Sequence, residues 1–122
     1  MAIRPITNIE LVDRICNEAP FLREARRRHL ADYQVLMPHV FMADILAFVG
    51  SLFRAGAPLP DAATLQDVRA VLACLEEGMR SGDRETRNVI ALSFVSDAEI
   101  EAFFVHLRPM LGARLQAEAH GR

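Results

Sequence analysis

The sequence contains no lysine, and all 14 of its basic residues are arginine. The codon bias of a GC-rich genome explains this pattern, so we draw no functional conclusion from it. The chain also lacks an excess of positive charge, because 16 acidic residues leave a formal net charge of −2. General nucleic-acid binding requires a basic face. The composition therefore argues against a nucleic-acid partner.

Cysteine is scarce, with only Cys16 and Cys74, which lie far apart in the chain and form no C-x-x-C pair. Two such residues do not make a zinc site of the finger type. Both stand among apolar residues, where a free cysteine packs as a small hydrophobic side chain. We expect reduced thiols, with one disulfide as the alternative. The spacing leaves open whether the two residues approach each other.

Long apolar runs are also missing. No segment reaches the roughly 20 apolar residues that a transmembrane helix requires. The first ten residues, MAIRPITNIE, lack the apolar centre of a secretory signal. We therefore expect a cytoplasmic protein with no membrane partner.

Strand signals are absent as well, because no segment alternates apolar and polar residues and no Asn-Gly hairpin turn occurs. The sequence instead places apolar residues at helical spacing, and its 52% hydrophobic and 25% charged residues are ordinary for a folded domain. A chain of 122 residues suits a single core. We predict one helical domain spanning residues 1–122, an all-α bundle of six or seven helices. Helix pairs joined by tight turns also allow a HEAT-like arrangement.

Capping residues and prolines set the expected helix boundaries. Six helix starts are predicted, at Thr7 with Glu10 in a capping box, Pro20, Pro38, Asp61, Asp83, and Ser96 with Glu99 in a second capping box. Gly56 is the expected end of the third helix. Pro109 either ends the sixth helix near Leu107, with a last helix following, or kinks it.

Apolar residues at helical spacing predict the faces that point into the core. In the third helix one broad arc holds Phe41, Met42, Ile45, Leu46, Phe48, Val49, Leu52 and Phe53. The opposite arc carries small residues that permit close approach, together with His39, Asp44 and Arg54. The other predicted inner faces include Ile9, Leu11, Val12 and Ile15; Phe21, Leu22, Ala25 and Leu30; and Leu65, Val68, Leu72, Leu75 and Met79.

The fifth helix should be central, because only Ser93 is polar between Val89 and Val95. Arg87 and Asn88 precede this apolar run. We predict that both are buried structural groups, since a buried arginine needs a carboxylate partner and a buried amide needs backbone acceptors. A direct binding role for the pair is the alternative.

No catalytic or phosphate-binding motif occurs, such as G-x-S-x-G or H-E-x-x-H. His29 and Asp32 share a helix face, but two ligands do not make a metal site. His39 and Asp44 are five residues apart, about 140° around a helix, so they cannot jointly hold one ion. We expect all four histidines, His106 and His120 included, at the surface or its rim, with a structural role for His39. No metal and no cofactor are predicted.

The densest basic segment runs from Arg23 to Arg28, where Glu24 and Arg28 have the i, i+4 spacing of an ion pair. A solvated helix face is one interpretation, and a docking patch for an acidic protein is another. Acidic residues in the fourth helix offer a face of opposite charge. The predicted partner contacts are Arg23, Arg27, Asp44, Glu76 and Glu77.

Two stretches, HLADYQVLMPHVFMADILAFV and LEEGMRSGDRETRNVIALSFV, resemble a group of small bacterial helical proteins. The shared patterns are HL-x-DY-x-x-L-x-PH-x-x-M-x-D and LE-x-G-x-x-SGD-x-x-x-RN-x-I-x-x-SF, over most of Leu30 to Val95. This group is associated with toxin–antitoxin and toxin-immunity systems. The motif residues are Asp32, Tyr33, Pro38, His39, Met42, Asp44, Gly82, Asp83, Arg87, Asn88, Ser93 and Phe94.

Two functions of different class follow. The first is a non-catalytic protein-binding module, specifically an immunity protein that neutralises a bacterial toxin by occluding it. Such a protein needs a rigid scaffold and a complementary face but no catalytic group. The alternative is a small helical enzyme or ligand-binding protein with a polar site around His39, Asp44, Arg87 and Asn88. That site requires the four side chains to converge on one pocket.

Overall fold

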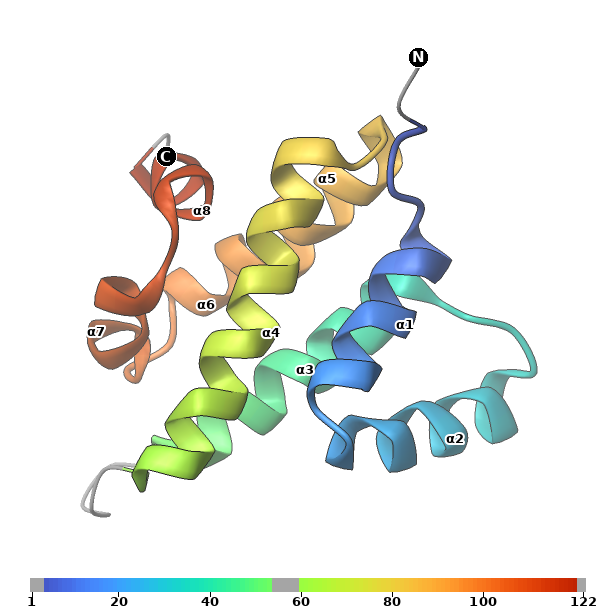
Figure 1. The fold of residues 1–122 in the computed structure, drawn as a ribbon, viewed down its shortest axis with the longest axis horizontal. Helices are drawn as coiled ribbons and strands as arrows, with labels where there is room; N and C mark the ends of the chain where they lie inside the picture. The colour runs from blue at the N-terminus through green and yellow to red at the C-terminus, as the bar shows by residue number, and fades with distance from the viewer. Residues whose placement is uncertain (1–3, 54–59, 121–122) are drawn as a thin grey trace.

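The computed structural model describes residues 4–53 and 60–120, and the described residues form helices joined by short turns (Figure 1). The helices are α1 (Asn8–Glu18), α2 (Phe21–Tyr33), α3 (Pro38–Leu52), α4 (Ala62–Ser81), α5 (Arg84–Ile90), α6 (Ser96–Glu99), α7 (Phe104–Leu107) and α8 (Ala113–His120). A π-helical turn, Ala91–Val95, joins α5 to α6 without a break, and a 3₁₀ turn, Arg108–Met110, follows α7. Counting α5 to α6 as one, the described residues form seven helices, which confirms the all-α prediction.

Three of the six predicted helix starts are confirmed by capping bonds. The Thr7 hydroxyl accepts the backbone N–H of Glu10 at 3.2 Å, which begins α1. The Asp61 and Asp83 carboxylates accept backbone N–H groups three residues ahead, each at 2.8 Å, and so begin α4 and α5. Pro38 is the first residue of α3. The predicted helix end at Gly56 lies outside the described residues, as do Arg54 and the side chain of His120.

The predicted capping box at Ser96 is wrong. Val95 already has helical backbone angles, and the chain enters α6 directly from the π turn, so no N–H group there needs a side-chain cap. Of the two alternatives at Pro109, the structure shows the first, in which the helix ends and a separate last helix follows. The helix α7 ends at Leu107, Pro109 lies in the 3₁₀ turn, and a separate last helix begins at Ala113.

The long helix α4 crosses the molecule and packs against α1, α5 and α8 (Figure 1). Gly78 allows this close packing, because a Cβ atom at this position would lie 2.7 Å from Ile90 Cδ1 and 3.3 Å from Leu11 Cδ1. One cluster of buried apolar side chains takes members from every helix. The described helices therefore share one core.

The segment before α1 is tied to the turn between α4 and α5. Ile6 donates its N–H to the Ser81 carbonyl at 2.9 Å and accepts the Asp83 N–H at 3.0 Å. Within the described residues this parallel bridge between Ile6 and Gly82 is the sole β-type pairing. A Cβ atom at Gly82 would lie 2.3 Å from the Gly78 carbonyl oxygen. The path of the backbone at position 82 therefore requires glycine.

The predicted inner face of α3 is confirmed, since six of its eight residues are buried and Phe48 and Leu52 are half-buried. The predicted face of α2 is wrong in part. Phe21 and Leu30 are 38% and 40% exposed, while His29 is buried. The buried side of α2 follows Leu22 and His29, seven residues apart, because this side rests on α1 and α3.

Candidate functional site

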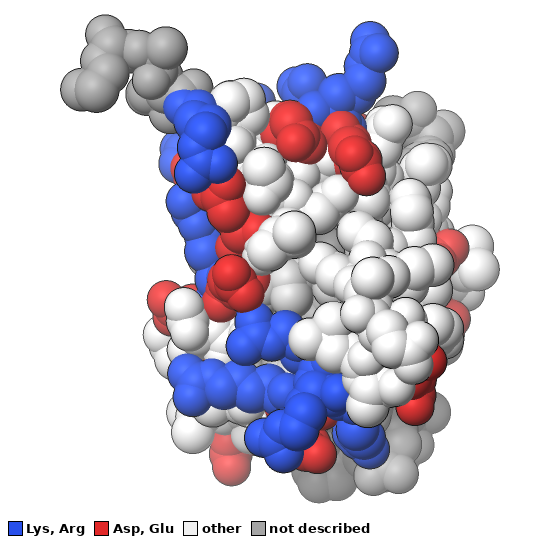
Figure 2. Space-filling model, turned by 90° about the vertical axis from the view of Figure 1, so that its right-hand side faces the viewer, with Lys and Arg blue, Asp and Glu red and all other residues white. Residues whose placement is uncertain are grey.

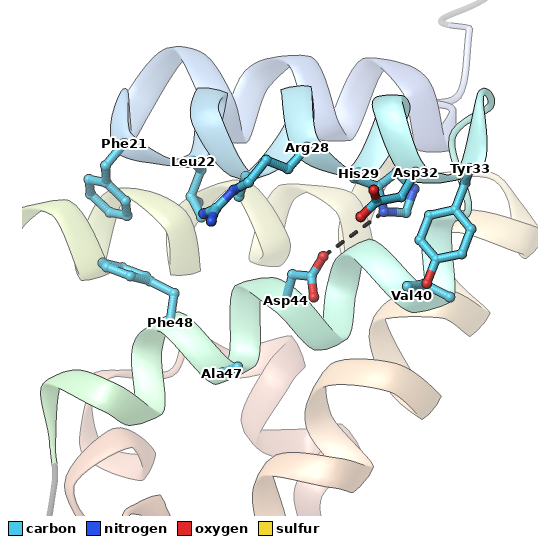
Figure 3. Close-up of a pocket in the computed structure, with 11 residues that line it drawn as sticks. Phe21, Leu22, Arg28, His29, Asp32, Tyr33, Val40, Asp44, Ala47 and Phe48 are labelled. Carbon is cyan, nitrogen blue, oxygen red and sulfur yellow. Dashed lines mark ion pairs between the residues drawn. The ribbon is translucent and has the colours of Figure 1, made fainter.

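A groove of about 480 Å³ lies between α2 and α3, and we call it the α2–α3 groove (Figure 3). Phe21 and Phe48 close one end, with ring centroids 4.0 Å apart. Tyr33 and Val40 stand at the other end. The polar side chains between these ends are Arg28, His29 and Asp32 from α2 and Asp44 from α3. Two facing helices thus enclose a polar centre between apolar ends.

His29 is the most buried polar group of the groove, with a side chain that is 0% exposed. Its Nε2 accepts the backbone N–H of Met37 at 2.9 Å. Since an amide N–H can only donate, Nε2 carries a lone pair and the proton of the neutral ring is on Nδ1. The ring also contacts Tyr33 at 4.9 Å and meets Phe41 edge to face at 5.4 Å. These contacts fix the orientation of the imidazole.

The Nδ1 atom of His29 faces Asp44 across the groove. Nδ1 lies 3.9 Å from Asp44 Oδ2, too far for a hydrogen bond, and it has no hydrogen-bond partner among the described residues (Figure 3). The Asp44 side chain is 49% exposed, so its carboxylate remains accessible from the solvent. The groove therefore pairs a buried donor with an accessible acceptor.

The prediction that every histidine lies at the surface or its rim is wrong for His29. Its spacing of seven residues from Leu22, which places the two on one face of α2, is the sequence signal that identifies it. The two parts of the first motif, HL-x-DY and PH-x-x-M-x-D, also meet here, because their residues His29, Asp32, Tyr33 and Asp44 line the same groove.

The alternative site of His39, Asp44, Arg87 and Asn88 does not assemble around this groove, since only Asp44 lines it. His39 is exposed and bonds through Nδ1 to the Ser93 hydroxyl of the π turn. The predicted burial of Arg87 and Asn88 is wrong, because both residues are exposed. Thr86, Val89 and Ile90 take the buried side of α5, which turns the two polar residues outward.

The predicted basic contacts are exposed but bonded within the chain. Arg23 donates through Nε to the Cys16 carbonyl at 3.0 Å. Arg27 pairs with Glu24 at 2.6 Å, so the i, i+3 neighbour forms the ion pair where we expected Arg28 to do so. These contacts hold the arginine side chains against α2 and α1 while their surface stays accessible.

Glu76 has a structural role that its sequence position does not suggest. Its carboxylate oxygens accept the backbone N–H groups of Arg114 and Leu115 at 2.9 and 3.0 Å, so a residue of α4 caps the start of α8. Glu77 instead bonds to Arg80 and to the Ser81 hydroxyl, and the Arg80 guanidinium lowers the pKa of its carboxyl group. The capping bonds of Glu76 remove much of its capacity to contact a partner.

An exposed apolar surface lies where the loop between α2 and α3 meets α1. Its apolar residues, which we call the Ile9–Val35 face, are Ile9, Val35, Leu36 and Pro38. Ile9 is 64% exposed, so its predicted place on the inner face of α1 is wrong, and Val35 is 59% exposed. Asp83 and Glu85 at the start of α5 border this face. Figure 2 shows a broad uncharged surface on this side of the molecule, between the arginines over α2 and a group of charges beside α5.

The two cysteines are free thiols; Cys16 is buried and Cys74 half-buried. Burial raises the pKa of both thiols, so neither is an activated nucleophile at neutral pH. Over residues 4–53 and 60–120, no three His, Cys, Asp or Glu side chains are placed to hold a metal ion. None of the helices in the described ranges has the length and apolar character needed to cross a membrane.

Comparisons of the chain with protein-family models, with curated proteins and with solved structures find no match. Two surfaces of the described residues bear on function, the α2–α3 groove and the Ile9–Val35 face.

Proposed function

We propose that the protein acts by binding another protein through the Ile9–Val35 face and catalyses no reaction. The exposure of Ile9 and Val35 carries this proposal, because two large aliphatic side chains that are more than half exposed and line the same hollow cost hydration free energy in the isolated protein. A partner that covers them recovers this free energy. The Ile6–Gly82 bridge and the Asp83 cap hold the surroundings rigid, which lowers the entropic cost of binding.

The charges around the face define the chemistry of the partner. Asp83 and Glu85 lie along one edge, and the Thr86 N–H lowers the pKa of Asp83, which keeps this carboxylate ionised. A complementary partner presents apolar side chains next to lysine or arginine. The predicted contacts Arg23 and Arg27 on α2 suit acidic groups of the same partner. Figure 2 shows arginine side chains gathered beside the uncharged surface.

The class of partner comes from the resemblance. Proteins with the HL-x-DY and SGD-x-x-x-RN patterns are associated with toxin immunity, so we propose that the partner is a bacterial toxin and that binding occludes its active surface in the cytoplasm. Occlusion needs only a stable interface, typically about 800 Å² on each side. The Ile9–Val35 face is the centre of that interface in this proposal.

The test is co-expression with the product of the neighbouring gene. We expect a complex that elutes as one species in size-exclusion chromatography, and we expect the chain to protect cells from the toxicity of its partner. Association should slow as the salt concentration rises, because the charged edges steer the two proteins together. If the two proteins elute separately and toxicity is unchanged, the proposal is wrong.

A further inference from the structure

The α2–α3 groove contains a buried hydrogen-bond donor on His29. The Nδ1–H of His29 is buried and faces Asp44 Oδ2 at 3.9 Å without a hydrogen-bond partner among the described residues. A buried donor of this kind costs free energy until something accepts from it. We propose that the groove binds a small, neutral, polyhydroxylated compound, a sugar or a polyol, and that one ligand hydroxyl bridges His29 and Asp44. This inference goes beyond protein binding and does not depend on it.

The geometry of the two groups selects the hydroxyl. An atom placed about 2.8 Å from both nitrogen and oxygen fits between atoms 3.9 Å apart. It must accept from Nδ1–H and donate to the carboxylate at the same time. A hydroxyl group does both. An ammonium group cannot accept from His29, and a carboxylate cannot donate to Asp44. A phosphate at neutral pH can donate through P–OH, but it brings negative charge beside the carboxylates of Asp32 and Asp44.

The remaining lining fits further hydroxyls of the same ligand. Asp32 supplies a second acceptor and Arg28 a set of donors, and Figure 3 shows both on the α2 side of the groove. The rings of Phe21 and Phe48 form an apolar wall at one end, suited to the C–H face of a sugar ring. A volume of about 480 Å³ lies within the usual range of small-molecule sites.

The experiment titrates the ¹⁵N-labelled protein with glucose, ribose and myo-inositol, and follows backbone amides and the His29 imidazole by NMR. We expect at least one of the three to shift the signals of His29, Asp32 and Asp44 saturably at concentrations up to about 50 mM, in the range of weak binding. The His29 Nδ1–H signal should shift with them. Inorganic phosphate and methylammonium should leave these signals unchanged.

A pair of variants gives the control. Asp44→Ala should weaken binding of the same compound at least about tenfold, a loss of about 1.4 kcal/mol, while Asp97→Ala, which removes an exposed aspartate of α6, should not. Both should keep the melting temperature of the wild type, since both side chains reach solvent. The proposal is overturned if none of the three compounds saturates the groove signals. It is equally overturned if Asp44→Ala binds as wild type, or if only phosphate or methylammonium binds.

Discussion

His29 joins the α2–α3 loop to the core, because it is the acceptor for the Met37 N–H and packs between Tyr33 and Phe41. Within the described part of the chain, the His39 side chain bonds only to Ser93, at the surface. We therefore predict that His29→Ala lowers the free energy of unfolding by about 1–3 kcal/mol, through an unsatisfied amide and a lost packing contact. His39→Ala should cost no more than about 0.5 kcal/mol. Equal losses for the two variants in urea denaturation would contradict the described role of His29.

For Arg87 and Asn88, in contrast to His29, we expect truncation to leave the free energy of unfolding nearly unchanged. Both project from the exposed side of α5, so neither leaves a buried group unsatisfied when it is truncated. Arg87→Ala and Asn88→Ala should change the free energy of unfolding by less than about 0.5 kcal/mol. Thermal melting measures this directly. A loss of several times that size would show that the pair acts as a structural tie after all.

At the scale of the element, the start of α8 depends on a side chain from another helix. Glu76 accepts two N–H groups of α8 in charge-assisted bonds, one from Arg114 and one from Leu115. Glu76→Ala should cost about 1–3 kcal/mol and release the last helix from α4. The neighbouring variant Glu77→Ala should cost less, since it breaks only contacts within α4 and its end. Hydrogen exchange of the α8 amides distinguishes the two: only Glu76→Ala should accelerate it.

Asp83, which caps the start of α5, should make the free energy of unfolding fall at acidic pH. The hydrogen bond from the Thr86 backbone N–H lowers the pKa of Asp83 below its ordinary value of 3.8. A carboxyl group with a lowered pKa in the folded state stabilises the protein fully above its unfolded pKa, and this contribution is lost as the pH falls through the folded pKa. Asp83→Asn keeps an amide cap but does not titrate. The wild type should therefore lose more stability than Asp83→Asn between about pH 5 and pH 2. If the free energy of unfolding of the wild type and of Asp83→Asn had the same dependence on pH, this prediction would be wrong.

The helix starts at Thr7, Asp61 and Asp83 were predictable from the sequence, because each cap bonds only to a residue three positions ahead. The burial of His29 and the capping role of Glu76 were not, since each depends on a helix that is distant in the chain or on the angle at which two helices meet.

The same contrast between local contacts and contacts from distant helices explains why the candidate site was predicted only in part. Asp44 was identified as a site residue, but the groove that surrounds it forms only when α2 packs on α3. The apolar run over residues 89–95 predicted a central helix, and this is right only in part, because Val89, Ile90, Phe94 and Val95 are buried but Leu92 is 53% exposed. The run also did not show which side of the first turn of α5 faces solvent. Arg87 and Asn88 were misplaced for that reason.

At the scale of the whole molecule, two valines of similar exposure lie at different places. Val35, 59% exposed, belongs to the Ile9–Val35 face, while Val105, 69% exposed, lies on α7. In Figure 1 the loop between α2 and α3 and the helix α7 are at opposite sides of the molecule. Val35 and Val105 are therefore a matched pair of positions for testing whether the Ile9–Val35 face binds the partner.

The most direct measurement is the dissociation constant of the partner complex by calorimetry, for wild type, Val35→Glu and Val105→Glu. A glutamate at the centre of an apolar interface should weaken binding by about 100-fold, the size of an interface hot spot. Val105→Glu should bind as wild type, and both variants should melt at the temperature of the wild type. If Val35→Glu binds as tightly as the wild type, or if Val105→Glu loses affinity to the same extent, the Ile9–Val35 face is not the binding surface.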